Sequence, residues 1–199
     1  MDFYSYNSAA VLAFPPGEGY PRLTRAALGE LADLLNSIER DRVFHGVVIA
    51  ANAESFATGA ELEEIAQLNG HAAREFARAG QRVFEKIAHL PLSVVAAIRG
   101  YCLGGGLDLA LACHARVATY DASFGHPGAA LGLLTGWGGT QRLPRLVGKA
   151  QALQMLLTGE RVPATQALTL GLVDELVPAE SLIPAAARRA EDLVRSFRE

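Results

Sequence analysis

Two glycine-bearing segments of the chain each follow an apolar run and precede a helical pattern. They are Phe56-Ala57-Thr58-Gly59-Ala60-Glu61 and Gly104-Gly105-Gly106. Three adjacent glycines cost backbone entropy, a cost that makes sense where a ligand must approach the main chain closely. The first N–H groups of a helix have no partner within the helix and attract anions. One N–H group from each segment would form an oxyanion hole for a thioester enolate, although the first segment taken alone is typical of an ordinary helix start.

The pattern argues against several other kinds of chemistry. The glycines fit neither the GxGxxG dinucleotide fingerprint nor the GxxxxGK[ST] phosphate loop. There is no GxSxG and no visible Ser/His/Asp arrangement, which makes a serine hydrolase remote. Cys102 and Cys113 lie in apolar runs without CxxC spacing, so we expect two buried, reduced thiols and no metal site.

The elements that must position these segments alternate between strands and helices. Apolar runs predict buried strands at about 8–14, 46–50, 93–98, 115–118, 122–124 and 173–177. Helical spacing predicts helices from Thr24 through Ile38, near Ala60, and at about 71–89, 107–113, 139–147, 149–158, 164–170 and 180–198. This order predicts an α/β fold with a largely parallel sheet. We expect one domain over 1–199, with a core of about 8–180 and a C-terminal helix of about 180–198.

The composition indicates a globular protein of the cytoplasm. The chain has 199 residues, of which 50% are hydrophobic and 20% charged, as is typical of one domain with its own core. Its formal net charge is −3 and it has no basic block, so we expect no nucleic-acid partner. The N-terminus lacks a signal-peptide pattern and the apolar runs are too short to cross a membrane, so we expect no membrane association.

Several segments taken together resemble the crotonase superfamily, the family of enoyl-CoA hydratases and isomerases. They are Phe56–Ile65, Leu92–Thr119, Phe124–Pro127, Gly138–Leu143, Leu157–Gly159 and Gly171–Asp174, in that order. The resemblance covers roughly residues 8–180, and the motifs are specific together although each is weak alone. It implies a spiral of repeated ββα units in which the C-terminal trimerisation segment of the relatives is truncated.

The resemblance also implies roles for individual residues. The N–H groups of Ala60 and Gly105 would form the oxyanion hole, and an acyl-CoA would be the substrate, with no permanently bound cofactor. The path of the thioester and pantetheine would be lined by residues of both glycine segments and by one later glycine: Gly59, Ala60, Glu61, Leu62, Glu63, Gly104, Gly105 and Gly128. Arg22 is a candidate for contact with the CoA phosphates, and a solvated arginine is the alternative.

Two positions depart from the pattern of the resembled hydratases, which use two glutamates. The first glutamate falls on Asp108, which keeps a carboxylate that is one methylene shorter. We keep two interpretations of Asp108. It is either a catalytic group or an acid in the first turn of a helix, where the helix dipole favours negative charge. The second falls on Gly128, which makes ordinary two-carboxylate hydration doubtful. Gly128 and the later segment Gly136-Trp137-Gly138 are similar to naphthoate synthases, but the nearby aspartate of those enzymes falls on Thr135, so we do not carry over their reaction.

His126 lies two residues before Gly128 and is a candidate to titrate near neutral pH. A histidine in a turn at the end of a strand is also typical of a hydrogen-bonded structural residue. We therefore keep both interpretations of His126, catalytic and structural.

The leading hypothesis is an enzyme of the hydratase/isomerase type, a lyase or isomerase that acts through a thioester enolate. A decarboxylase is the first alternative, because it needs the oxyanion hole but no strong base. The second is a non-catalytic protein that binds acyl thioesters. The expected partners are an acyl-CoA or an acyl-carrier-protein thioester, and the resemblance implies a homo-oligomer, either a trimer or a hexamer.

Overall fold

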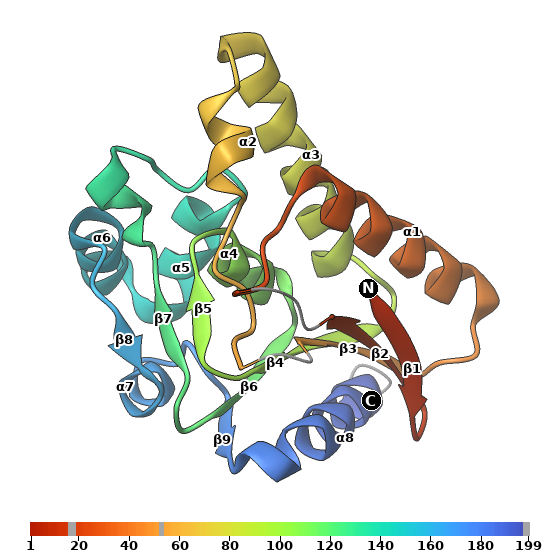
Figure 1. Cartoon of the computed structure of the whole chain (residues 1–199). Coiled ribbons are helices and arrows are strands. Elements are labelled where there is room, and N and C mark those ends of the chain that lie inside the picture. The colour runs from red at the N-terminus through yellow and green to blue at the C-terminus, as the bar shows by residue number, and fades with distance from the viewer. Residues whose placement is uncertain (16–18, 52–53, 197–199) are drawn as a thin grey trace.

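The computed structural model describes residues 1–15, 19–51 and 54–196 (Figure 1). Its larger sheet has the strand order β1-β2-β3-β4-β6-β9. Only the pair β1/β2 is antiparallel among the described strands of this sheet, and its other neighbouring pairs are parallel. The strands are β1 (Asp2–Tyr6), β2 (Ala9–Phe14), β3 (Gly46–Ala51), β4 (Ser93–Ile98), β6 (Ala115–Thr119) and β9 (Glu175–Val177).

A smaller sheet lies beside the larger one and carries one of the glycine segments at its edge. It has the order β5-β7-β8, with β5 parallel to β7 and β7 antiparallel to β8. Its strands are β5 (Tyr101–Leu103), β7 (Ser123–Gly125) and β8 (Val162–Pro163). Because α4 begins directly after β5, the smaller sheet fixes where that helix starts.

One helix, α8 (Leu182–Ser196), packs on one face of the larger sheet, and several helices pack on the other face. They are α1 (Arg25–Asp41), α2 (Leu62–Ala66), α3 (Gly70–Ala88), α4 (Gly105–Ala112), α5 (Gly139–Val147), α6 (Lys149–Thr158), α7 (Ala164–Thr169) and α8 (Leu182–Ser196), with the short 3-10 helices η1 (Pro127–Leu131) and η2 (Ala179–Ser181). On one face, Ala186 and Ala190 of α8 pack against valines of the sheet such as Val48 and Val95. On the other face, α1, α3 and α4 form the main core, and Figure 1 shows α8 on the opposite side of the strands from α1 and α3.

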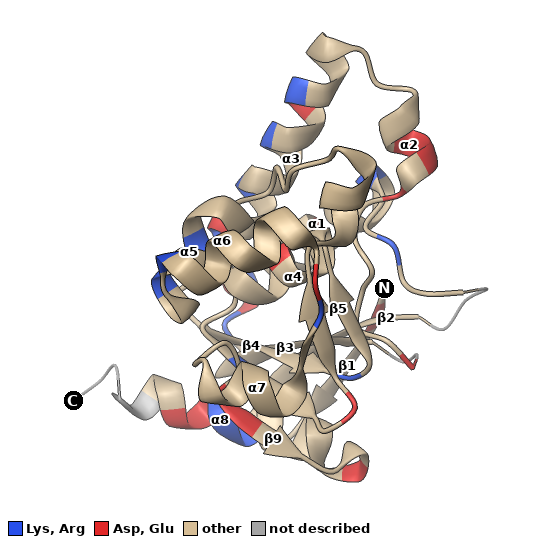
Figure 2. Ribbon diagram, turned by 90° about the vertical axis from the view of Figure 1, so that its left-hand side faces the viewer, with Lys and Arg blue, Asp and Glu red and all other residues tan. Residues whose placement is uncertain are grey.

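Most charged residues lie on the helices and loops, and the central strands β3 and β4 carry none. In Figure 2 the ribbons of β3 and β4 are free of blue and red, as their sequences GVVIAA and SVVAAI require. None of the helices in the described part of the chain is long and apolar enough to cross a membrane.

The expected α/β fold with a largely parallel sheet is confirmed, but several boundaries differ. The helix expected near Ala60 begins at Leu62, and the helix expected from residue 107 begins at Gly105. Strands β1, β5 and β8 are not in the sequence-based prediction, because short strands have no long apolar run. The last helix ends at Ser196, and residues 197–198 of its expected range lie outside the described residues.

Candidate active site

The two glycine segments lie side by side in the structure. Ala57 bridges to Cys102, and main-chain hydrogen bonds join Ala57 N to Tyr101 O (3.1 Å) and Leu103 N to Ala57 O (2.9 Å). Because of this pairing, the residues that follow in the two segments lie close to each other. A Cβ atom built on Gly59 would lie 3.2 Å from Gly105 N. The φ of Gly59 is +107°, a value that favours glycine, so the turn that brings the segments together depends on this residue.

The N–H groups of Ala60 and Gly105 are both available to a ligand. Gly105 is the first residue of α4, and Ala60 directly precedes the N-cap residue of α2, Glu61. Within the described part of the chain, neither N–H donates to a main-chain carbonyl. Both residues line one cavity of about 450 Å³. The structure therefore brings together the two residues that the sequence pairs.

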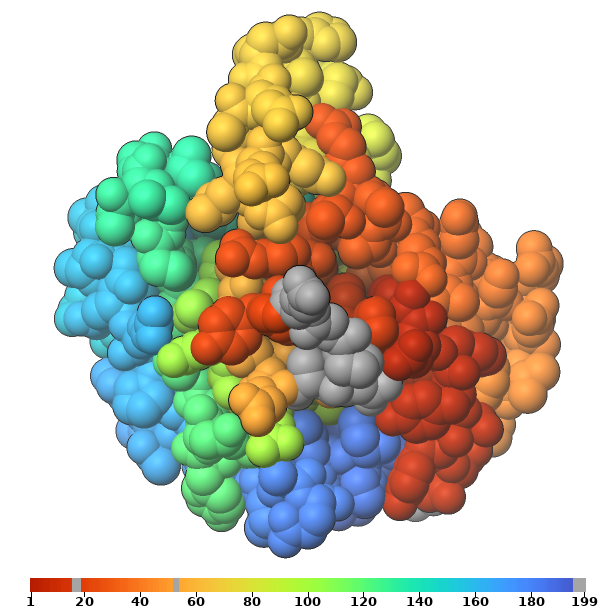
Figure 3. Space-filling model, viewed as in Figure 1, coloured from red at the N-terminus to blue at the C-terminus, as the bar shows by residue number. Residues whose placement is uncertain are grey.

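Some of the predicted binding residues line this cavity and others do not. Arg22, Gly59, Leu62, Gly104 and Gly128 line it together with Ala60 and Gly105. Glu61 and Glu63 are not among the lining residues, because Glu61 caps α2 and Glu63 is exposed on that helix. In Figure 3 the yellow surface of α2 and the turquoise surface around η1 stand on either side of a hollow.

Much of the cavity wall is apolar. It includes side chains of α2, α3 and η1 and of the segment that follows η1: Leu62, Ile65, Leu68, Phe76, Leu131, Leu133, Leu134 and Trp137. An apolar wall with a few converging polar groups is typical of a small-molecule site. The wall suits an aliphatic chain, and the main-chain N–H groups of Ala60 and Gly105 suit a carbonyl oxygen.

Asp108 is almost completely buried at the wall of this cavity, in the first turn of α4, with 1% of its surface exposed. Its Oδ2 accepts hydrogen bonds from the Thr135 hydroxyl and from the main-chain N–H of Trp137, the second at 3.2 Å. Its Oδ1 makes no hydrogen bond of normal geometry with a described residue. Burial raises the pKa of Asp108 to about 6, although the hydrogen bonds, Arg142 and the nearby main-chain N–H of Gly139 oppose the shift. The pKa of this carboxyl group is therefore close to neutral pH.

His126 follows β7 and lies beside Asp108. Its Nε2 is 3.7 Å from Asp108 Oδ1, and 4% of its surface is exposed. Burial lowers the pKa of His126 to about 4, so the imidazole is neutral at physiological pH. Neither ring nitrogen has a hydrogen-bond partner in the described part of the chain, which does not fit the interpretation of His126 as a hydrogen-bonded structural residue.

Comparison with known proteins assigns the chain to a family. The family model described as enoyl-CoA hydratase/isomerase matches residues 13–199. The chain belongs to this family.

Solved structures of similar proteins cover nearly the whole chain. DspI from Pseudomonas aeruginosa has 35% sequence identity and a TM-score of 0.90, with 98% of this chain and 80% of DspI covered. An enoyl-CoA hydratase from Bacillus anthracis has 34% identity and a TM-score of 0.90, with coverages of 98% and 77%. An enoyl-CoA hydratase from Thermoplasma volcanium has 26% identity and a TM-score of 0.88, with coverages of 99% and 82%.

Trp137 packs closely against the start of α4 in this hydratase/isomerase chain. A Cβ atom on Gly105 would lie 2.4 Å from the Trp137 ring, and one on Gly80 would lie 2.3 Å from it. The ring also packs against Phe76 and Phe84, with centroid distances of 5.2 and 5.6 Å. Glycine at position 105 therefore lets α4 approach the ring, which holds the start of the helix in place.

Sequence reasoning missed the contribution of two residues near the site. Thr135 was noted only because it replaces an aspartate, and Trp137 only as part of the Gly136-Trp137-Gly138 segment that is similar to naphthoate synthases. Both contact Asp108 through hydrogen bonds. The glycines that make room for the ring are Gly80 and Gly105, which are far from Trp137 in the sequence, so no local pattern pointed to this contact.

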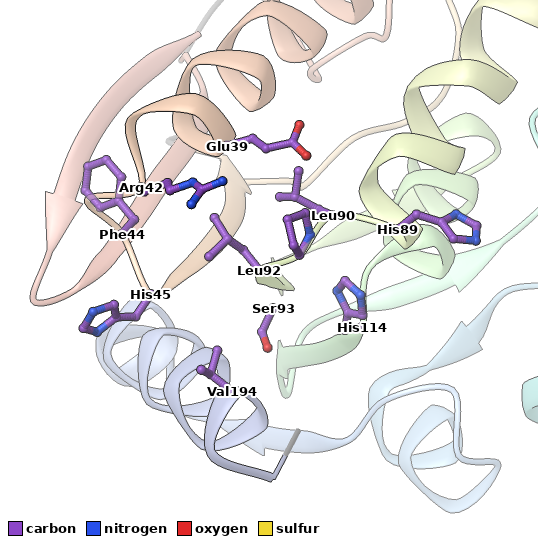
Figure 4. A pocket seen from close by; sticks show the side chains of 11 residues that line it. Glu39, Arg42, Phe44, His45, His89, Leu90, Leu92, Ser93, His114 and Val194 are labelled. Carbon is purple, nitrogen blue, oxygen red and sulfur yellow. The ribbon is translucent and has the colours of Figure 1, made fainter. Parts of the chain in front are cut away.

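A larger cavity of about 790 Å³ lies on another part of the hydratase/isomerase fold. His45, His89 and His114 are among its lining residues, and Figure 4 shows their rings spread around it rather than directed to one point. His114 Nδ1 already accepts a hydrogen bond from Val94 N at 2.9 Å. Across the described ranges, no three acidic, histidine or cysteine residues form a group able to hold a metal ion. We therefore place the candidate active site in the smaller cavity.

Proposed function

We propose that the chain is an enzyme that binds an acyl-CoA or acyl-carrier thioester and stabilises its enolate with the N–H groups of Ala60 and Gly105. The observation that carries the proposal is the position of these two groups, side by side in a cavity that also contains Asp108. Two N–H groups directed at a carbonyl oxygen stabilise the negative charge that develops there when the enolate forms. Membership of the enoyl-CoA hydratase/isomerase family supports a CoA thioester as the substrate. We propose no permanently bound cofactor.

Asp108 is the proposed acid–base group of this reaction. A general base works best when its pKa is near the working pH, and burial raises the pKa of Asp108 to about 6. Gly128 lines the same cavity and offers no second carboxylate. The site therefore suits reactions that move one proton through an enolate, such as a double-bond shift, better than the addition of water. We assign the chain to the isomerase or lyase type on this ground.

Hydration of crotonyl-CoA should be weak or absent. The reaction needs one group to take a proton from water and a way to deliver a proton to carbon, and Asp108 is the only carboxylate in the cavity wall among the described residues. The measurement is a steady-state assay of crotonyl-CoA consumption. A turnover of about 10–10³ per second, typical of good enzymes, would show that Gly128 does not prevent hydration.

An acyl-CoA should raise the melting temperature of the protein. A ligand that binds only the native state stabilises it by about 2.7 kcal/mol at a hundredfold excess over Kd. The measurement is thermal unfolding with acyl-CoAs of increasing chain length, with free CoA as the control. Absence of any shift with CoA and carrier thioesters alike would argue against an acyl-thioester site.

Two alternatives remain as second candidates because Gly128 removes one acid from the site. A decarboxylase would release CO₂ from a carboxyacyl thioester and needs the oxyanion hole without a strong base. A non-catalytic protein would bind the thioester and release it unchanged. Liquid chromatography with mass spectrometry separates all three cases, because decarboxylation changes the mass, a double-bond shift changes the retention time at constant mass, and a binding protein changes neither. The family also leads us to propose a homo-oligomer, a trimer or a hexamer, located in the cytoplasm.

A further inference from the structure

The two carboxylate oxygens of Asp108 are not equivalent. Oδ2 accepts hydrogen bonds from the Thr135 hydroxyl and the Trp137 N–H. Oδ1 makes no hydrogen bond of normal geometry in the described part of the chain. A Cβ atom on Gly139 would lie 2.2 Å from Oδ1, so glycine at that position keeps the space beside this oxygen open. An unpartnered, buried polar atom on a residue of the cavity wall is a candidate reacting group.

A titratable side chain beside this oxygen is the imidazole of His126. Nε2 lies 3.7 Å from Oδ1, which is longer than a hydrogen bond. A neutral imidazole carries one N–H and one lone pair. A bare nitrogen and a carboxylate oxygen have no proton to share, so the separation fits a pair in which neither atom is protonated. A proton taken up by Oδ1 would supply the missing donor.

On the basis of the proposed function, we propose that Thr135 and His126 complete the acid–base machinery around Asp108. Thr135 is a positioning residue that engages Oδ2 and leaves Oδ1 as the reacting oxygen. His126 accepts a hydrogen bond through Nε2 when Oδ1 becomes protonated. Neither residue corresponds to a second carboxylate, and together they let a single aspartate perform the proton transfer.

The proton-transfer step is balanced. The C–H bond beside the thioester carbonyl breaks, and its proton moves to Oδ1 of Asp108. The electron pair of that bond passes to the carbonyl, whose oxygen becomes the enolate oxygen between Ala60 N–H and Gly105 N–H. The protonated Oδ1 then donates a hydrogen bond to His126 Nε2. Return of the proton to the same carbon, or to another carbon of the enolate, regenerates the carboxylate.

Few other titratable groups face this pair. Arg142 of α5 acts on Asp108 through its charge, while it donates to Trp137 O at 3.1 Å and pairs with Glu85 of α3. Cys102 of β5 also lies within electrostatic range, but burial raises the pKa of its thiol well above neutral pH. A pH dependence between about 4 and 8 in the proton transfer would therefore come from Asp108 and His126 themselves.

Two variants should move the pH dependence in opposite directions. Thr135→Val removes a donor to the carboxylate and should raise the pKa of Asp108, whereas His126→Leu removes an acceptor for the protonated form and should lower it. We expect shifts of about one pH unit each, with rates about tenfold lower at the optimum. Thr135→Ser and His126→Gln keep a donor and an acceptor and should lie close to the wild type.

The readout is the exchange of α-protons of a saturated acyl-CoA with D₂O, followed by NMR as a function of pH. Opposite shifts of the acidic limb, with recovery in the two conservative variants, support the proposal. Unchanged limbs, or shifts in the same direction, overturn it. An altered fold would lower the rate without this pattern.

A second measurement separates this proposal from the proposed function. NMR titration of the labelled Asp108 carboxyl carbon in the free protein needs no turnover. If no acyl-CoA exchanges protons, the proposed function fails, while the opposite shifts of the Asp108 pKa in Thr135→Val and His126→Leu still test the arrangement. If exchange occurs but the two variants leave the pKa of Asp108 unchanged, the proposed function stands and this inference fails.

Discussion

Asp108→Asn should reduce the rate of proton transfer by about 10²–10⁴-fold, because the amide cannot take a proton from carbon. The change keeps the size and shape of the side chain. Its amide oxygen can still accept from Thr135 and Trp137, as Oδ2 does in the wild type. Binding of acyl-CoA, measured by calorimetry, should change little. Equal exchange rates in both proteins would show that Asp108 is only an acid at the start of a helix.

The same variant should be more stable than the wild type at neutral pH. Burial raises the pKa of Asp108 from 3.8 to about 6, so its ionisation favours the unfolded chain. The contribution of Asp108 to stability is fully present below the unfolded pKa and is lost as the pH rises through about 6. Asparagine removes this cost, and a shift of this size corresponds to at most about 3 kcal/mol at pH 7. Denaturant unfolding at pH 7 measures the difference, and a loss of stability in Asp108→Asn would contradict the burial argument.

Gly105→Pro should lower the rate of enolate formation by about 10²–10³-fold, the cost that is typical of losing one donor of an oxyanion hole. Gly105 is the first residue of α4, where proline is tolerated because its missing N–H has no partner within the helix. The variant therefore removes the proposed donor without breaking a hydrogen bond within the helix, but its side chain meets the Trp137 ring, so folding must be checked as well. The measurement is α-proton exchange from a saturated acyl-CoA.

The matched control for the proline variant is Gly105→Ala. Its Cβ atom meets the Trp137 ring at 2.4 Å, a contact that proline shares, while its N–H is kept. Thermal unfolding of both variants reports the steric cost, which should be similar. The exchange rate should be much lower for Gly105→Pro than for Gly105→Ala. Equal rates in the two variants would mean that the N–H of Gly105 does not stabilise the enolate.

The sequence predicted the central parts of the fold because those parts depend on local patterns. The buried strands β3 and β4 are continuous apolar runs, and Thr24 caps α1 as its hydroxyl and position suggest, accepting from Ala27 N at 3.1 Å. Strand β5 was missed because it has only three residues and forms through pairing with a distant strand, β7. Such long-range pairing leaves no local signal.

The candidate site was predicted in part for a similar reason. The pairing of Ala60 with Gly105 followed from a resemblance in several motifs, and the structure places both in one cavity. The hydrogen bond from Thr135 to Asp108 joins a residue of α4 to a residue 27 positions later that has no regular secondary structure, so no periodic pattern predicted it. The absence of hydrogen-bond partners around the His126 ring in the described part of the chain depends on tertiary burial. The sequence around one histidine does not reveal such burial.

The most direct test of the central claim is the exchange of α-protons between a saturated acyl-CoA and D₂O in the presence of the unmodified protein. Exchange requires only that the thioester binds, that its enolate is stabilised, and that one base removes and returns the proton. It requires no knowledge of the natural acyl chain or of the reaction that follows. We expect exchange well above the rate without protein, and its loss in both Asp108→Asn and Gly105→Pro. No exchange from any acyl-CoA that binds the unmodified protein would contradict the assignment of Ala60, Gly105 and Asp108 as an enolate-forming site.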